Sequence, residues 1–415
     1  MRVAVVLFTR DLRIHDNPAL SAAARTFDRV VPLFVHDPAL PAPRFLASAL
    51  ADLQSSLRRL GADLVERRGA PAEEAVKVAR AVGAEGLGLA DDVSRYARTR
   101  LARLADACAA ERIALKTFPG VTVVPPGTLR PSGGGEHYKV FTPYWRAWQA
   151  AQLRDVEPAP RALRLPDDLP ASWTRDRAVS GPAGETAARR RLTSWLRHAD
   201  DYAEIHDDLA ADRTSRLSPY LHYGCLSPRE VVSRTSVEPF VRQLCWRDFY
   251  HQVLASFPDL RRRAYRPGAP DSWKDDRAAF EAWKAGQTGV PIVDAGMRQL
   301  LAEGWMHNRA RLITASYLTK HLGVDWRPGA DHFYDLLLDG DVANNYGNWQ
   351  WVAGTGNDTK PYRRFNPIRQ AERYDPSGDY VRRYVPELAD LDGKQIHQPW
   401  LVPGTRKYPA PLTQP

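Results

Sequence analysis

The chain has 415 residues, of which 44% are hydrophobic, and it contains 12 Trp, 16 Tyr and 12 Phe. This composition supplies enough apolar surface for a core and excludes wholesale disorder. No stretch reaches the ~20 uncharged apolar residues needed to cross a bilayer, and the first apolar run meets Asp11 and Arg13 too early for a secretory signal. The length fits two to three domains, and we expect two.

The cysteines and the net charge indicate the compartment and the kind of partner. Cys108, Cys225 and Cys245 lie far apart without a CxxC pair, so we expect no disulfides, no metal site and a cytoplasmic protein. The 58 Lys and Arg exceed the 49 Asp and Glu, which gives a net charge of +9. Such an excess favours a polyanionic partner such as nucleic acid, although charge alone does not locate the binding surface.

Residues 1–125 alternate between short apolar runs and stretches of helical periodicity. The predicted strands are Val3–Phe8, Val30–Val35, Asp63–Val65, Gly86–Leu89 and Ala114–Phe118. This alternation is typical of a doubly wound parallel sheet in an α/β domain. Asp16 is the predicted N-cap of the first helix, with Pro18 in its first turn. The turn before it lacks GxGxxG, which argues against a dinucleotide fingerprint.

A connector is predicted at residues 126–185. Ten prolines lie between Pro119 and Pro182, and the only convincing helical piece there contains Trp145 and Trp148. We expect this segment to wrap over the surface.

The remainder of the chain has a different core. All twelve tryptophans lie at or beyond Trp145, and the pattern from residue 186 to residue 400 is helical throughout. This predicts a mostly α domain at 186–400, followed by a Pro-rich tail at 401–415. Walker A, HExxH, GxSxG and zinc-finger spacings are missing, which removes the commonest nucleotide hydrolases, metalloproteases and serine esterases.

Two predicted helices carry polar and aromatic stripes where an amphipathic helix would place Leu or Val. The first stripe consists of Gln243, Trp246, Arg247 and Tyr250. The second consists of Trp305, Asn308, Arg309 and Leu312, with His307 and Arg311 paired on an adjoining face. Two such faces favour one lined cavity. The alternative is that Trp246 and Trp305 belong to the core while the arginines reach water.

Two further segments are rich in polar groups. The first runs from Asp339 through Gly340 and Asp341 to a cluster of amides and indoles, namely Asn344, Asn345, Asn348, Trp349 and Trp351. A ligand or a loop explains so many polar groups, and a calcium loop fits poorly because the later oxygen ligands are missing. The second segment, residues 214–219, offers hydroxyls at an apparent helix start, where a diphosphate could bind.

Together these motifs resemble the photolyase/cryptochrome family over nearly the whole chain. The matching segments are Thr214–Ser218 (TSRLS), Trp246–Tyr250 (WRDFY), Gly289–Arg298 (GVPIVDAGMR), Trp305–Arg309 (WMHNR), and Asp339–Asp341 (DGD) with Trp349–Trp351 (WQW). The resemblance implies an N-terminal α/β antenna domain and an all-α C-terminal domain that binds FAD.

By position, the resemblance implies a set of flavin contacts. Those on the diphosphate and ribitol side are Tyr202, Thr214, Ser215, Arg216, Leu217 and Ser218. The others are Arg247, an Arg311–Asp339 ion pair over the isoalloxazine, Gly340, Asp341 at the ring edge and Asn345 at flavin N5. Asn345 fits a fully reduced anionic flavin, whereas plant and animal cryptochromes usually have Asp or Cys there.

The implied reaction is light-driven repair, catalysed by a carbon–carbon lyase. Excited reduced FAD gives an electron to a cyclobutane pyrimidine dimer in UV-damaged DNA, the ring bonds break and the electron returns. The dimer leaves the duplex to reach the flavin. The implied DNA contacts are stacking by Trp246 and Trp351, edge contacts by Gln243 and Asn308, phosphate contacts by Arg247 and Arg309, and packing by Leu312.

The resemblance also implies an electron route and an antenna pigment. Trp273, Trp326 and Trp349 fall at the positions of the electron-transfer chain that reduces FAD from the surface, although three indoles in a helical core would fit equally well. Residues 91–96 and the 10–13 turn form the expected antenna rim. They favour 8-hydroxydeazaflavin slightly over methenyltetrahydrofolate.

Departures from the family pattern keep alternatives open. Gln243 replaces the Glu of most cyclobutane-dimer photolyases, Leu312 replaces a frequent Met, and residues 345–348 are similar to those of DASH cryptochromes. The alternatives are a cryptochrome-type blue-light receptor, a DASH-like repair flavoprotein that prefers single strands, or a DNA-binding module without flavin. A receptor would usually carry a C-terminal extension, so we expect a repair enzyme. We also expect a monomer and no membrane partner.

Overall fold

A computed structural model describes residues 1–415 except 42, 174–180, 270, 405–406 and 415. The chain forms two compact units that interleave along the sequence. Unit 1 consists of Met1–Tyr138, Pro143–Asp200 and Ser215–Pro258. Unit 2 consists of Lys139–Thr142, Asp201–Thr214 and Asp259–Pro415.

These units do not follow the linear domain boundaries at residues 125, 185 and 400, which stay a prediction. Residues 174–180 of the predicted connector, and 405–406 and 415 of the predicted tail, lie outside the described residues.

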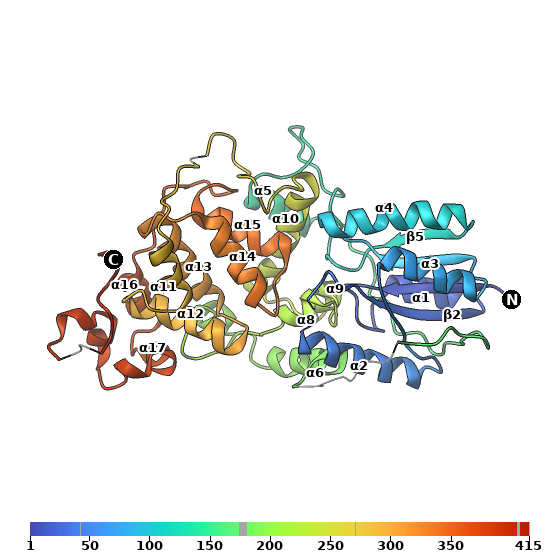
Figure 1. The fold of residues 1–415 in the computed structure, drawn as a ribbon, viewed down its shortest axis with the longest axis horizontal. Helices are drawn as coiled ribbons and strands as arrows, with labels where there is room; N and C mark the ends of the chain where they lie inside the picture. Colours follow the sequence, from blue (N-terminus) through green and yellow to red (C-terminus); the bar gives the residue numbers. More distant parts are fainter. Residues whose placement is uncertain (42, 174–180, 270, 405–406, 415) are drawn as a thin grey trace. The chain divides into compact units, whose positions relative to one another are not determined.

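Unit 1 contains a five-stranded parallel sheet (Figure 1). Its strands are β1 (Val3–Phe8), β2 (Arg29–His36), β3 (Val65–Arg68), β4 (Gly86–Ala90) and β5 (Ala114–Phe118). Their order is β3-β2-β1-β4-β5, and Val5 of β1 pairs with both Val31 and Leu87. The order reverses between β1 and β4, which is where folds of this kind bind ligands. The predicted doubly wound sheet is confirmed.

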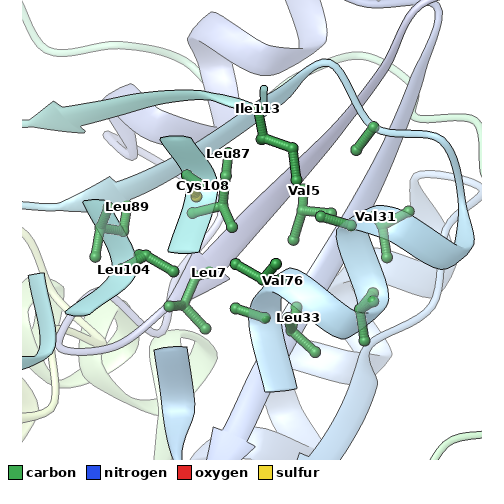
Figure 2. Close-up of a cluster of buried hydrophobic side chains, with 14 of the residues drawn as sticks. Val5, Leu7, Val31, Leu33, Val76, Leu87, Leu89, Leu104, Cys108 and Ile113 are labelled. Carbon is green, nitrogen blue, oxygen red and sulfur yellow. The ribbon is translucent and has the colours of Figure 1, made fainter. Parts of the chain in front are cut away.

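Helices cover the sheet because its three central strands, β2, β1 and β4, are buried on both faces. The first four are α1 (Pro18–Thr26), α2 (Arg44–Arg59), α3 (Pro71–Ala81) and α4 (Arg95–Ala110). On one face, Val5 and Leu7 pack with Val76 of α3 and Leu104 of α4 (Figure 2). On the other face, Gly86 leaves room for the Phe27 ring that follows α1, since a Cβ at Gly86 would lie 2.7 Å from that ring.

The boundaries of the predicted third strand differ from those of the observed strand. β3 begins at Val65, whereas the prediction ran from Asp63 to Val65. Asp63 instead belongs to the turn before the strand, where its carboxylate accepts hydrogen bonds from Gln54 and Arg58 at 2.8 Å and 3.1 Å. A short apolar run therefore marks the strand's presence but not its first residue.

The predicted N-cap of α1 is also wrong. Asn17 caps this helix, and its Oδ1 accepts a hydrogen bond from the Leu20 amide at 3.0 Å. Asp16 has a left-handed φ of 48° and turns its carboxylate toward Arg154 and Ser227. These partners are distant in the sequence, so capping preference alone did not reveal them.

The rest of unit 1 combines helices with long segments that have no regular secondary structure. Its helices are α5 (Phe141–Gln149), α6 (Gly184–Leu196), α8 (Ser218–His222), α9 (Pro228–Ser233) and α10 (Glu238–Ser256). The helical piece predicted around Trp145 and Trp148 is α5. Buried Asp248 of α10 accepts hydrogen bonds from the Trp148 indole at 3.0 Å and the Val124 amide at 2.9 Å, which ties α10 to the segment after β5. Burial raises the pKa of Asp248 to about 6.

Unit 2 is helical, as predicted. Its α-helices are α7 (Tyr202–Ile205), α11 (Arg277–Lys284), α12 (Pro291–Glu303), α13 (Asn308–Ser316), α14 (Trp326–Leu336), α15 (Val342–Ala353), α16 (Pro367–Tyr374) and α17 (Asp379–Tyr384). A π-helical turn, η1 (Tyr317–His321), extends α13, and short 3-10 turns occupy η2 (Pro386–Leu388), η3 (Gly393–His397) and η4 (Pro399–Leu401). Within the part of the chain that the structure describes, no helix is long and apolar enough to cross a membrane.

The predicted tail packs against unit 2. The Tyr408 hydroxyl donates to buried Asp294 of α12, and the Leu412 amide donates to the Thr288 carbonyl at 2.9 Å. Gly289 has a φ of 76°, and a Cβ there would lie 2.3 Å from the Ala410 carbonyl oxygen. Buried Tyr408 therefore attaches the tail to α12, while most of the other described tail residues are exposed.

Candidate active site

A pocket in unit 2 lies among α13, α14 and α15. Its lining includes six of the residues predicted from the sequence, namely Asn308, Arg311, Leu312, Asp339, Asn345 and Trp349. Asn344 and Asn348 add amides, whereas Phe333 and Val352 add apolar surface. The pocket therefore combines an apolar wall with charged and amide groups, as expected of a site for a large organic cofactor.

Arg311 and Asp339 form an ion pair at this pocket. The Arg311 Nη2 lies 2.9 Å from Asp339 Oδ2, and the Arg311 Nε donates to the Met306 carbonyl at 2.8 Å. Asp339 is buried, so the pair holds its charges in a fixed position. Gly340 permits the tight turn that follows, because a Cβ there would lie 2.7 Å from the Tyr334 carbonyl oxygen.

The amide cluster lies on the first two turns of α15. Asp341 is the N-cap of this helix, and its Oδ1 accepts from the Asn344 amide at 2.8 Å. Asn345 donates through Nδ2 to the Ala330 carbonyl at 2.8 Å, which fixes the direction of its side chain. Its Oδ1 accepts no hydrogen bond from a described residue. Asn345 thus presents an oriented amide oxygen to the pocket.

One expected helix face differs from the prediction. Helix α13 begins at Asn308, so Trp305 precedes the helix and cannot share a face with Asn308 and Leu312. His307 is the N-cap, and its Nδ1 accepts from the Arg309 amide at 3.1 Å. Burial lowers the pKa of His307 to about 4, which keeps the imidazole neutral near pH 7. His307 therefore supports the helix and does not pair with Arg311.

Arg309 has partners within unit 2. Its Nε donates to Asp207 at 3.1 Å, and its guanidinium lies 4.4 Å from the centroid of the Tyr374 ring. These contacts orient the side chain, which leaves its predicted role toward DNA phosphate as a prediction.

The hydroxyl-rich segment is a loop that ends in a short helix. α8 begins at Ser218, so Ser215, Arg216 and Leu217 precede it, and Arg216 has a left-handed φ of 48°. Within unit 1, Arg191 of α6 donates to the Ser215 carbonyl at 2.6 Å and holds this loop.

Two predicted flavin contacts belong to unit 2 instead. The buried Thr214 Oγ1 has no hydrogen-bond partner among the described residues. Tyr202 is also buried, and its ring stacks on His206 at 5.0 Å.

Helix α10 presents the predicted stripe in part. Gln243 is exposed, Trp246 and Arg247 are half-buried, and Tyr250 is buried. The Trp246 ring stacks on Tyr250 with centroids 5.7 Å apart. Arg247 donates to the Val121 and Leu221 carbonyls, so its guanidinium also joins α10 to α8. Gln243 and Trp246 are therefore the accessible members of the stripe.

The three predicted electron-transfer tryptophans lie in unit 2. Trp349 and Trp326 are buried, whereas Trp273 is partly exposed. Trp349 packs edge-on against Phe333 at 5.0 Å, and a Cβ at Gly329 of α14 would lie 2.6 Å from the Trp349 ring. Gly329 is one helical turn beyond Trp326, so α14 connects the surroundings of both indoles.

Exposed aromatic and basic groups beside Trp351 were missed by the sequence interpretation. Tyr362 is 88% exposed, and the Arg363 guanidinium lies 5.6 Å from the Trp351 ring centroid. An exposed aromatic beside a stacked cation is a common platform for nucleic-acid bases. The segment PYRRF offered this signal, because two adjacent arginines there are flanked by aromatics.

A second polar cluster occupies the carboxyl edge of the sheet in unit 1. Arg10 and Asp92, from the turns after β1 and β4, approach to 3.4 Å, and the Tyr96 hydroxyl donates to Asp37 at 2.6 Å. Arg100 of α4 places its guanidinium 5.7 Å from the Tyr96 ring, and its buried Nε has no hydrogen-bond partner among the described residues. Sequence interpretation placed the rim here but missed Arg100, which lies one helical turn beyond it.

Comparison with known proteins identifies relatives along nearly the whole chain. The family described as "DNA photolyase" matches residues 4–164, and the family described as "FAD binding domain of DNA photolyase" matches residues 240–414. The chain is 50% identical to the deoxyribodipyrimidine photo-lyase of Streptomyces griseus, over 99% of this chain and 96% of that protein. It is 38% identical to the enzyme of the same name from Halobacterium salinarum, over 94% and 90%.

Solved structures give the same result. A bacterial class III photolyase from Agrobacterium tumefaciens superposes with a TM-score of 0.92 at 35% identity, covering 100% of this chain and 95% of that one. An archaeal photolyase from Sulfolobus tokodaii, described with two FAD molecules and a novel light-harvesting cofactor, superposes with a TM-score of 0.89 at 30% identity, covering 99% and 96%.

Proposed function

The chain belongs to the photolyase/cryptochrome family, and we propose from this that it repairs UV-damaged DNA by splitting cyclobutane pyrimidine dimers under blue light. The observation that carries the proposal is the 50% identity to a deoxyribodipyrimidine photo-lyase over 99% of the chain. Bound FAD, in its reduced form, supplies the light-driven electron. The chain itself has to bind the cofactor, orient the lesion and exclude water.

The residues of the unit 2 pocket fit a flavin. The buried Trp349 Nε1 has no hydrogen-bond partner among the described residues, and such a group is costly unless a ligand or water satisfies it. The Arg311–Asp339 pair and the oriented Asn345 amide provide hydrogen-bonding groups beside apolar Phe333.

We assign the remaining flavin contacts to the residues carried over from the family pattern. Tyr202 and the 214–218 segment would contact the diphosphate and ribitol side of the flavin, and the family pattern adds Arg247, Gly340 and Asp341. Since Arg247 and Asp341 already have partners within the protein, they would act by holding α10 and α15 in place.

DNA would be held by the exposed aromatic and basic groups of each unit. In unit 1, Trp246 and Gln243 are accessible for stacking and for a base edge. In unit 2, Trp351 would stack on a base, Asn308 would contact a base edge and Arg309 would contact phosphate. Exposed Tyr362 adds a further aromatic ring. A dimer has weakened stacking and pairing, so its removal from the duplex costs little. We propose a monomer that acts on DNA in the cytoplasm.

An antenna pigment would bind at the carboxyl edge of the sheet. The strand order reverses there between β1 and β4, and Arg10, Asp92 and Arg100 gather at that edge. The arginines at this edge favour a ligand with a negative charge, which both 8-hydroxydeazaflavin and methenyltetrahydrofolate carry. The order that places 8-hydroxydeazaflavin slightly ahead therefore rests on the family pattern, and an absorption spectrum of protein from its native host tests it.

The decisive experiment for the activity is repair of a defined duplex that contains one cyclobutane dimer. Protein with chemically reduced FAD should clear the dimer under blue light and leave it intact in the dark. A colourless protein, or a yellow protein that clears no dimer under light, would contradict the proposal. Undamaged duplex provides the binding control.

A further inference from the structure

The solvent-facing side of α6 in unit 1 is strongly basic. Its residues on this side are Arg189, Arg190, Thr193, Ser194 and Arg197, and they border a hollow of about 550 Å³ together with Glu230 and Arg234 of α9. The opposite side of α6 is apolar, with Ala188 and Leu192 buried. The helix is therefore anchored by one face while the other remains free to bind.

One buried carboxylate holds part of this surface in place. Glu230 is 5% exposed, and its oxygens lie 2.9 Å from Arg189 and 3.6 Å from Arg234. Arg234 also donates to the Thr193 hydroxyl at 2.7 Å. Two of the guanidinium groups are thus fixed before any ligand arrives, which reduces the entropy lost on binding.

The charges of the hollow do not cancel. Four arginines line it and one carboxylate opposes them, which leaves three positive charges in excess. Arg190 and Arg197 are exposed, and neither forms an ion pair with a described residue. An external anion would offset this excess of positive charge. Arginine binds phosphate oxygens in two-pronged geometry, and a hydroxyl such as that of Ser194 also contacts phosphate.

We propose that this hollow binds the phosphate backbone of DNA, as a sequence-independent contact made by residues other than those that line the unit 2 pocket. The inference rests on the proposed repair function, which makes DNA the polyanion that the protein meets. The basic face runs from Arg189 to Arg197, about 12 Å along the helix, which is longer than one phosphate group. Duplex DNA places a phosphate every ~3.4 Å along each strand, so the face spans more than one.

The test is the salt dependence of binding to undamaged duplex and to duplex with one dimer. The variant R190Q/R197Q removes two unpaired charges from the hollow. The matched control R44Q/R103Q removes two exposed arginines from α2 and α4 of the same unit, so its net charge is equal. In the hollow variant, the slope of log K against log salt should fall by about 1.8, because each phosphate contact contributes about 0.9. The control should keep the slope of the original protein.

Three further measurements make the result decisive. The charge-preserving variant R190K/R197K should retain the slope, and all variants should keep their melting temperature and flavin spectrum. Light-driven repair of a short dimer-containing oligonucleotide should be unchanged, which separates this inference from the activity itself. Equal slopes for the hollow variant and its control would overturn the proposal. Inorganic phosphate that protects Arg190 from chemical modification, with no change in the DNA slope, would also overturn it.

Discussion

Arg327 lies with its guanidinium 5.0 Å from the centroid of the Trp326 ring. The same guanidinium binds Asp271 at 2.9 Å, and the Trp273 indole donates to Asp271 at 3.1 Å. A cation therefore lies over the buried indole, while a carboxylate contacts the partly exposed one. This arrangement disfavours positive charge on Trp326 and favours it on Trp273. If these tryptophans carry electrons to the flavin, the field drives the positive charge outward.

Replacing Asp271 by Asn should lower the yield of light-driven flavin reduction. The change removes the negative charge beside Trp273, so positive charge on this indole is less stabilised and returns inward more often. Asp271 is largely exposed, so we expect a change of about two- to fivefold. Transient absorption of tryptophan radicals measures it. Asp325→Asn is the control, because Asp325 also binds Arg327, whereas the Trp273 indole donates to Asp271. An equal loss in both variants would contradict the assignment.

Replacing Trp349 by Phe should abolish photoreduction of oxidised FAD. Repair by chemically reduced protein should remain, because the two processes use different electron routes. Phe keeps the edge-on packing with Phe333, so the free energy of unfolding should fall by only about 1 kcal/mol.

Trp283→Phe is the matched control for Trp349→Phe. Trp283 lies 5.9 Å from Trp349 but is not one of the three predicted carriers. Photoreduction should therefore survive this change. Undiminished photoreduction in Trp349→Phe would show that the assigned route is wrong or bypassed.

His307 should make the protein less stable as the pH falls below 6.5. Its pKa is about 4 in the folded state and near 6.5 when exposed, so the unfolded chain binds the additional proton between these values. The stability present above pH 6.5 is therefore lost progressively as the pH falls to about 4. His307→Asn keeps an N-cap side chain for α13 without this proton.

The effect of His307 is isolated by comparing the pH dependence of stability in His307→Asn with that in the original protein. Buried Asp248 and Asp375, whose pKa values are raised to about 6, change stability in the opposite direction over the same range. The free energy of unfolding, measured in urea, should fall between pH 8 and pH 5 by about 1 to 3 kcal/mol more in the original protein than in His307→Asn. Parallel pH profiles would show that His307 is not held neutral.

The fold was predictable from the sequence because its signals are local. Continuous apolar runs marked each of the five strands, and helical periodicity marked α10 with its stripe from Gln243 to Tyr250. Boundaries were less accurate where a single side chain had a distant partner. Asp is a favoured residue type at helix N-caps, but the Asp16 carboxylate binds Arg154, which is 138 residues away in the sequence.

The site was predictable only in part, for the same reason. The motifs containing Arg311, Asp339 and Asn345 were recognisable as family segments, and the structure brings them to one pocket. The link from Trp273 through Asp271 to Arg327 joins residues 56 positions apart and belongs to no motif. Pairings of this kind depend on tertiary packing, which periodicity and composition do not encode.

The lesion specificity follows from Gln243, Asn308 and Leu312. Photolyases for the (6-4) photoproduct carry a Gln at the first position, but they also carry a pair of His that would fall at positions 308 and 312. Asn308 and Leu312 line the pocket here, and neither supplies the imidazolium proton that (6-4) repair needs. His307 does not replace them, because it is buried, neutral and occupied as the N-cap of α13.

We therefore expect cyclobutane-dimer repair, in which Gln243 contacts a base edge. Gln243 is exposed in the protein alone and would become buried against the dimer. Gln243→Ala should weaken dimer binding by about 1 to 3 kcal/mol, since it leaves polar groups of the base unpaired. Gln243→Glu is the control, because it keeps the length of the side chain and one acceptor oxygen, replaces the NH2 donor by a second acceptor, and restores the residue of most dimer photolyases. Binding and light-driven repair are measured on duplexes that each contain one lesion. Repair of the (6-4) product without repair of the cyclobutane dimer would contradict this assignment.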